Sequence, residues 1–168
     1  GVVGCPVCKR EYEINEGVVQ FGPDPLLGRS SRSDDITVEE IPDPEIVQAL
    51  LALQLEGGYV VLVGSVTRLA NQLAERIGEV HFVGVNPPPD VTESTVLSLL
   101  QSDSKIPLKA GRARGCVIGE EYAEEPWLTE AGRVLMTGQR MVVANESATV
   151  SGVNPIVADR GLWVGVRE

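Results

Sequence analysis

The residues best suited to chemistry in this sequence are two cysteines in a short turn, Cys5-Pro6-Val7-Cys8. Two thiolates at this spacing can supply half of the four ligands that structural zinc takes, or can act as a redox pair. The redox interpretation is disfavoured, because the pair does not open a helix after a strand. We expect either a knuckle whose cysteines simply pack, or a zinc site through Cys5 and Cys8 that needs further ligands, including any that precede Gly1.

The other nucleophilic or basic side chains lack partners in the sequence. Cys116 and His81 fall in stretches that predict strands, so we expect a core residue and a strand-end residue rather than ligands or catalysts. An acidic run, 120–125, follows a predicted strand; it suits a cation or a basic partner, but the simpler expectation is a solvated loop. Arg68 and Arg140 are expected to form surface ion pairs. No catalytic residue is predicted.

The elements that position these residues alternate between strands and helices. Pro44 predicts a helix start with Asp43 as its cap, and this helix is expected to run to about Leu55 before Gly57-Gly58. Further apolar runs predict strands at 59–63, 80–85, 116–118 and 141–144, with helices at 66–77, 93–101 and 126–137. This order predicts an α/β fold, a Rossmann-like doubly wound and mainly parallel sheet. A terminal hairpin is expected from 150–157 and 162–166.

Three regions follow from the same reading. Residues 1–22 predict a small β-rich unit, 23–45 a proline-rich linker, and 46–168 the Rossmann domain. The chain begins with Gly1, so we expect either processing or a sequence that starts partway into its gene product.

Two segments within the predicted domain carry a family resemblance. The segment 127–145, with Arg133-Val134-Leu135 and Gly138, is similar to the helix, turn and strand near the end of class I S-adenosylmethionine-dependent methyltransferases. The segment 103–108 resembles the stretch in which an acidic residue, here Asp103, lies near the adenine in that family. The resemblance covers about residues 46–145 and implies the same fold. Residues 4–21 are similar to the second half of a zinc ribbon, as found in a methyltransferase activator protein.

The match to the methyltransferases breaks at the cofactor. The family has an acidic residue and Gly-x-Gly-x-Gly after its first strand, whereas only Gly64 remains here, and Val66 and Arg68 are expected to fill cofactor space. The acidic ribose ligand after the second strand is replaced by Asn86. If S-adenosylmethionine binds, Gly64, Asn86 and Asp103 are its expected contacts. Only a short segment follows Asn145, which leaves little for a substrate lid.

These departures predict a non-catalytic, methyltransferase-like docking or structural subunit of a larger protein assembly, without a cofactor. The alternatives are a methyltransferase with an atypical cofactor turn, or a module that binds another nucleotide or metabolite in the same crevice. The net charge of −10 disfavours nucleic acid as a partner. No apolar run approaches the ~20 residues of a transmembrane helix. A protein partner and a cytoplasmic location are expected.

Overall fold

The computed structural model describes residues 1–21, 40–53 and 57–168. In this part of the chain ten strands form one sheet in the order β1-β2-β3-β6-β5-β4-β7-β8-β10-β9. The strands are β1 (Val2–Gly4), β2 (Glu11–Asn15), β3 (Val18–Gln20), β4 (Tyr59–Val63), β5 (His81–Val85), β6 (Leu97–Gln101), β7 (Ala113–Ile118), β8 (Leu135–Val143), β9 (Val153–Asp159) and β10 (Leu162–Arg167). The helices are α1 (Pro44–Leu51), α2 (Ala70–Ile77) and α3 (Trp127–Val134), with 3-10 helices η3 (Gly64–Leu69) and η4 (Glu120–Tyr122).

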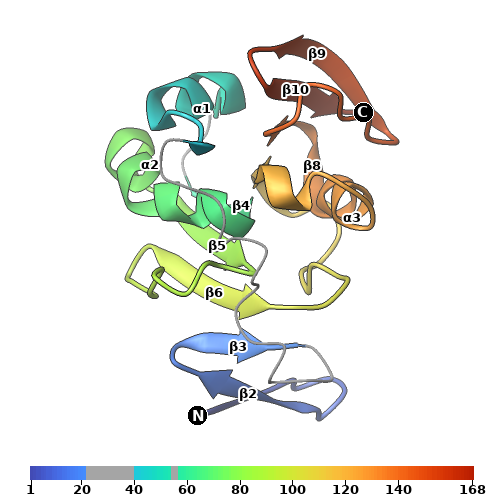
Figure 1. Ribbon diagram of the computed structural model, residues 1–168. Coiled ribbons are helices and arrows are strands. Elements are labelled where there is room, and N and C mark those ends of the chain that lie inside the picture. Colours follow the sequence, from blue (N-terminus) through green and yellow to red (C-terminus); the bar gives the residue numbers. More distant parts are fainter. Residues whose placement is uncertain (22–39, 54–56) are drawn as a thin grey trace.

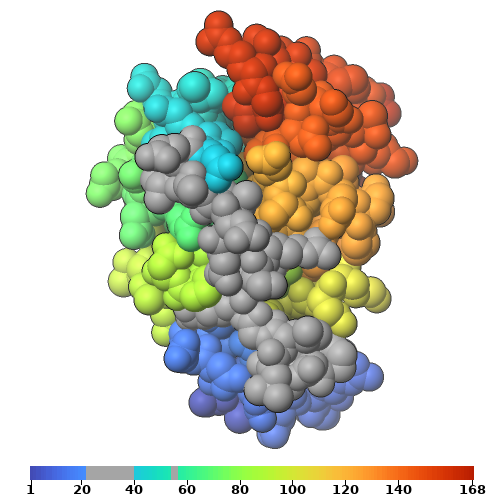
Figure 2. Space-filling model, viewed as in Figure 1, coloured from blue at the N-terminus to red at the C-terminus, as the bar shows by residue number. Residues whose placement is uncertain are grey.

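The middle of the sheet is parallel and its two ends are antiparallel. Strands β3, β6, β5, β4, β7 and β8 run in one direction, while β1–β2–β3 and β8–β10–β9 pair in alternating directions. The N-terminal strands and the C-terminal hairpin therefore lie at opposite ends of the molecule (Figures 1 and 2). The predicted α/β fold with a mostly parallel sheet is confirmed.

Strand β4 shows why the sheet is covered on both faces. Its side chains alternate, with Val60 and Leu62 in one apolar cluster and Val61 and Val63 in another. Helices α1 and α2 contribute to the first cluster, and α3 contributes to the second. A run without polar alternation is what a strand buried on both faces requires, so the prediction for 59–63 holds.

Helix α1 begins as the sequence predicts. The Asp43 carboxylate accepts a hydrogen bond from the Glu45 N–H at 2.8 Å, and Pro44 occupies the first turn. The helix ends at Leu51, earlier than expected, because Ala52 adopts a left-handed conformation with φ of 48°. Residues 54–56 lie outside the described part, as does the portion of the expected linker from 23 to 39.

The helix predicted for 93–101 is wrong. Residues 97–101 form strand β6, which pairs in parallel with β5 on one side and β3 on the other. Leu97 and Leu99 both enter the α1–α2 core, a spacing of two that suits a strand. Two neighbouring strands thus determine the conformation against a local pattern that also fits a helix.

The helix predicted for 126–137 forms, but α3 ends at Val134 and β8 begins directly at Leu135. Gly138 does not turn the chain into the strand: it lies within β8, with φ of 82°, where the pairing with β7 shifts register. The terminal hairpin is confirmed as β9 and β10. No helix among the described residues is both long and apolar enough to cross a membrane.

Candidate functional site

The candidate site lies at the carboxyl edge of three adjacent parallel strands. Gly64 follows β4 and Asn86 follows β5, while Asp103 lies two residues beyond the end of β6. Because parallel strands end at the same edge, the sheet brings the three predicted contact positions to one side of the molecule.

The turn after β4 is built around Gly64, whose φ of 79° suits a residue without a Cβ. The Thr67 hydroxyl closes the turn by donating to the Gly64 carbonyl at 2.8 Å. The prediction that Val66 and Arg68 fill cofactor space is wrong: Val66 is 1% exposed and packs in the α1–α2 core, and Arg68 extends away to Asp90. The two-pronged Arg68–Asp90 contact is the surface ion pair that the sequence predicts for Arg68. These two side chains are engaged elsewhere and do not cover the turn.

The space above Gly64 is filled instead from η4, the segment after β7. The Glu121 carboxylate accepts hydrogen bonds from the Ser65 N–H at 2.5 Å and from the Ser65 hydroxyl at 2.9 Å. A Cβ on Gly64 would collide with this carboxylate and with the ring of Tyr122. Tyr122 is 2% exposed and stacks edge-on against Trp127, with ring centroids 5.3 Å apart. The glycine turn is therefore closely covered by the chain's own side chains.

The expected solvated loop at 120–125 is thus only partly right. Glu120, Glu124 and Glu125 are exposed, but Glu121 and Tyr122 point back onto the β4 turn. The prediction missed these two because their contacts lie far away in the chain. The only sequence signal is an aromatic residue inside an acidic run, since a ring seldom stays in water when a core is near.

Asn86 is buried and holds its own loop together. Its φ of 52° lies in the left-handed region, which asparagine tolerates better than most residues. Its side-chain oxygen accepts from the Ser102 N–H at 2.9 Å, and its own N–H donates to the Leu100 carbonyl. The side-chain oxygen of Asn86 therefore links the ends of β5 and β6, and burial of the residue keeps it away from solvent.

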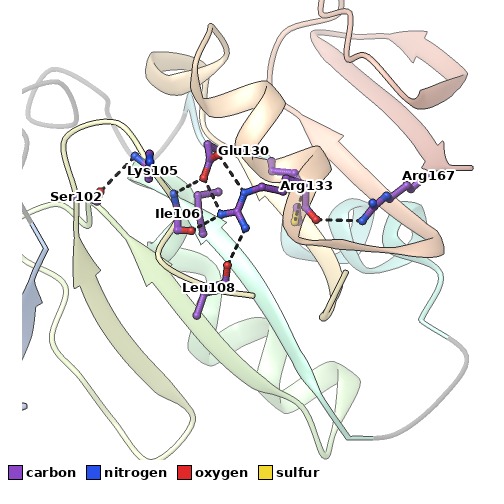
Figure 3. Close-up of polar contacts among 9 residues, drawn as sticks. Ser102, Lys105, Ile106, Leu108, Glu130, Arg133 and Arg167 are labelled. Atoms are coloured by element: carbon purple, nitrogen blue, oxygen red, sulfur yellow. Dashed lines mark hydrogen bonds and ion pairs between the residues drawn. The ribbon is translucent and has the colours of Figure 1, made fainter. Parts of the chain in front are cut away.

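The segment after β6 is fixed by helix α3 rather than by Asp103 (Figure 3). Arg133 donates to the carbonyls of Ile106 at 2.6 Å and Leu108 at 2.9 Å, and it pairs with Glu130 at 2.7 Å. Glu130 also accepts from the Ile106 N–H at 2.9 Å. Glu130 thus caps the loop before Ile106, while Asp103 is exposed.

The contacts of Arg133 and Glu130 with the backbone at 106–108 join the two segments that carry the family resemblance. The bidentate hydrogen bonds to Arg133 lower the pKa of Glu130 below its ordinary value, against an opposing effect of burial. The same bonds raise the pKa of Arg133. Both groups are therefore charged at neutral pH, and the 102–108 loop has a rigid connection to α3.

The cysteine turn forms a compact knuckle between β1 and β2. The Cys8 N–H donates to the Cys5 sulfur at 3.5 Å. The Lys9 N–H donates to the Cys5 carbonyl, and the Cys5 N–H donates to the Arg10 carbonyl, which closes the turn. The Cys5 pKa is lowered by hydrogen bonds from the backbone of Cys8 and then Val7. Within the described residues no group of three or more His, Cys, Asp or Glu is placed to hold a metal, so the knuckle by itself does not fit a complete zinc site.

The remaining candidates lie where the sequence places them. Cys116 is fully buried in β7, and burial raises the pKa of its thiol to about 12. His81 begins β5, and its Nε2 lies 2.9 Å from the Ser98 hydroxyl on β6. Neither residue faces the carboxyl edge of the sheet.

Comparison with known proteins identifies the fold. No protein-family model matches the sequence, and no curated protein is a significant match. Among solved structures, a SAM dependent methyltransferase from Aquifex aeolicus is similar, with 18% identity and a TM-score of 0.53 over 79% of this chain and 92% of that chain. The chain has a methyltransferase-like α/β fold.

Two further solved structures match with lower TM-scores. The antibiotic-resistance methyltransferase Kmr has 12% identity and a TM-score of 0.49, over 74% of this chain and 92% of that chain. A complex between the Trm112 methyltransferase activator of Haloferax volcanii and a methyltransferase has 20% identity and a TM-score of 0.47. That match covers 60% of this chain, and the chain spans only 50% of the length of the matched Haloferax chain.

Proposed function

We propose that this chain is a non-catalytic, methyltransferase-like protein that serves as a docking or structural subunit of a larger protein assembly. The observation that carries the proposal is the pair of hydrogen bonds from Ser65 to Glu121, directly above Gly64. In a methyltransferase-like fold this is the turn that the cofactor's amino acid portion has to approach. Here an internal carboxylate uses the donors, and the Tyr122 ring excludes the rest of the space.

A ligand at this turn would have to displace both groups. Each hydrogen bond to a charged group contributes about 1.5–3 kcal/mol, and exposing the buried Tyr122 ring costs a similar amount. A ligand carboxylate would also meet a like charge if Glu121 stayed nearby. Asn86 adds to the obstacle, because it is only 3% exposed and its side-chain oxygen is directed at the Ser102 N–H. These terms together are comparable with the ~8 kcal/mol of a micromolar complex.

Calorimetric titration with S-adenosylmethionine tests the proposal. We expect no binding by the wild-type chain at cofactor concentrations up to about a millimolar. The same titration of Glu121→Ala, with Glu120→Ala as the matched control in the same 3-10 helix, shows whether the carboxylate is what closes the turn. Micromolar binding of the cofactor by the unaltered protein would refute the non-catalytic assignment.

The second candidate is an S-adenosylmethionine-dependent methyltransferase with an atypical cofactor turn. One observation favours it: Gly64, Asn86 and Asp103 follow three adjacent parallel strands and so lie along one edge of the sheet. This candidate requires η4 to move away from the turn when the cofactor enters. Native mass spectrometry of the purified protein distinguishes the candidates, because a retained cofactor or another nucleotide would appear as a defined added mass.

The N-terminal strands enter the proposal as an arm for the partner. Val2, Val3 and Val7 are exposed at 58%, 39% and 89%, so this end of the sheet offers apolar side chains to a partner. Zinc at Cys5 and Cys8 would require two more ligands from outside the described set. Metal analysis of the protein together with its captured partner tests this part.

A further inference from the structure

Outside the N-terminal strands, the exposed large apolar side chains of the described residues gather along one groove. Ile46, Ile156 and Val157 are exposed at 49%, 48% and 43%. Ile46 lies on α1, and the other two lie on β9, the last strand at that end of the sheet (Figure 1). Scattered exposed residues need no explanation, but apolar side chains that face one hollow indicate a binding surface.

Two cavities follow the groove between α1 and the β9–β10 hairpin. The larger has a volume of about 850 Å³, and its apolar lining includes Ile46 and Leu50 from α1 and Val157 from β9. The smaller, of about 380 Å³, lies between the last turn of α1 and Ile156 with Val166. Among the described residues, hollows therefore separate helix α1 from the β9–β10 hairpin.

Charge distinguishes the two ends of the groove. Five carboxylates line the larger cavity, against one cation, Arg160, which itself lies 3.7 Å from the Asp159 carboxylate. The acidic residues are Glu40, Asp43, Glu120, Glu146 and Asp159. The smaller cavity instead carries Arg140, whose guanidinium donates to the Leu50 carbonyl at 3.3 Å. An occupant that is apolar along its length and basic at one end matches this distribution.

We propose that this groove docks an amphipathic helix of a partner protein. Its apolar stripe packs on Ile46, Leu50 and Val157, and lysines or arginines at one end face Glu120 and Glu146. A helix laid beside α1 packs over the exposed side chains of the β9–β10 hairpin, as helices cover sheets within domains. The inference rests on the proposed function, because it names the chemistry of the partner that a docking subunit would take.

Two variants on α1 separate the groove from the rest of the helix. Ile46→Glu places a charge in the groove, and the fold tolerates it because Ile46 is half exposed in the first turn, where glutamate suits the helix dipole. Ala49→Glu is the matched control, since Ala49 is exposed on the same helix and lines a different hollow beside Arg76 and Ile77. Thermal unfolding by circular dichroism checks that both variants fold.

The probe is a fluorescein-labelled peptide of about 14 residues, roughly four helical turns, built from leucine, alanine and lysine. Its leucines form one stripe and its lysines occupy one end. A second peptide replaces these lysines with glutamates, and a third scrambles the order at constant composition. Fluorescence anisotropy measures the affinity of each, at low and at high salt.

We expect the lysine peptide to bind the wild-type chain and Ala49→Glu with equal affinity. Its affinity for Ile46→Glu is expected to be at least about tenfold lower. The glutamate and scrambled peptides are expected to bind the wild-type chain with at least about tenfold lower affinity than the lysine peptide. High salt is expected to lower the affinity of the lysine peptide.

Three results would overturn the inference: no binding of the lysine peptide, equal affinity for Ile46→Glu and wild type, or equal affinity of the scrambled peptide. So would a wild-type dimer that Ile46→Glu dissociates, because the occupant would then be a second copy. S-adenosylmethionine titration of the same preparations reports on the proposed function separately, since Ile46 and Ala49 lie on α1, away from the β4 turn.

Discussion

Glu121 and Ser65 are 56 residues apart in the chain, yet the Glu121 carboxylate accepts both hydrogens that Ser65 can donate. The contact joins η4, which follows β7, to η3, which follows β4. Adjacent parallel strands bring these two loops to the same edge of the sheet. The Glu121 side chain thus accepts the hydrogen bond of the Ser65 N–H and also covers Gly64.

Removing this carboxylate is expected to destabilise the fold. Glu121→Ala leaves the partly buried Ser65 N–H without its charged acceptor, so we expect a loss of about 1–3 kcal/mol in the free energy of unfolding. Glu121→Gln retains an acceptor oxygen and should lose less. Urea denaturation measures both. The exposed Glu120→Ala is the control and should change stability by no more than about 0.5 kcal/mol; an equal loss in the control would show that general charge, and not this contact, is responsible.

Arg133→Ala is expected to be more damaging, because three groups depend on one guanidinium. The carbonyls of Ile106 and Leu108 lose their donor, and Glu130 loses its counter-ion. We expect about 2–4 kcal/mol of destabilisation in urea, with Arg133→Lys recovering only part of it, since an ammonium cannot reproduce the planar fork. Arg76→Ala, an exposed arginine on α2, is the matched control. Full recovery by lysine would contradict the bidentate geometry.

The Glu130 carboxylate gives stability a predictable pH dependence. Hydrogen bonding to Arg133 lowers its folded pKa, so its contribution is complete above the unfolded value of about 4.3 and is lost as pH falls further, through the folded pKa. The difference in unfolding free energy between wild type and Glu130→Gln should therefore be largest near pH 7 and narrow below about pH 4. Urea melts at a series of pH values measure it, with the exposed Glu75→Gln as control. A difference that stays constant down to pH 3 would argue against the charged pair.

The parts of the fold that the sequence predicts are those with local causes. Strand β4 follows from an uninterrupted apolar run, and α1 follows from an aspartate cap and a first-turn proline, so neither needs distant partners. Residues 97–101 differ, because their local pattern fits a helix and only pairing to β3 and β5 makes them a strand. The same reasoning explains the early end of α3, where β8 pairs with β7.

In the candidate site too, the features with local causes could be predicted from the sequence, and those that depend on distant contacts could not. The positions of Gly64 and Asn86 could be predicted, because each follows a predicted strand. The position of Asp103 could not, because the residues before it, 97–101, fit a helix locally and become strand β6 only by pairing with β3 and β5. Which side chain covers the glycine turn could not be predicted, because Glu121 and Tyr122 reach it through the order of strands in the sheet. The sequence predicts that role for Val66 and Arg68, because they follow Gly64 within the glycine motif.

The three cysteines should react with an alkylating reagent at very different rates. Cys8 is exposed and Cys5 has a lowered pKa, whereas Cys116 is fully buried with a pKa raised to about 12. At pH 8 we expect iodoacetamide to modify Cys5 and Cys8 in the native protein and Cys116 only after unfolding in urea. Peptide mass spectrometry locates the adducts. Modification of Cys116 at the rate of the other two would mean that β7 opens far more readily than its packing implies.

Gly64→Ala tests whether the glycine turn is closed by contact as well as by backbone conformation. Gly64 and Gly152 have nearly the same φ, 79° and 76°, so alanine should meet a similar backbone strain of about 1–2 kcal/mol at both positions. A Cβ at Gly152 has no neighbour within 4 Å, whereas at Gly64 it meets the Glu121 carboxylate and the Tyr122 ring. We therefore expect Gly64→Ala to lose at least about 1 kcal/mol more than Gly152→Ala in urea denaturation. Equal losses would mean that η4 moves aside readily, and that the space above the turn is open to a ligand.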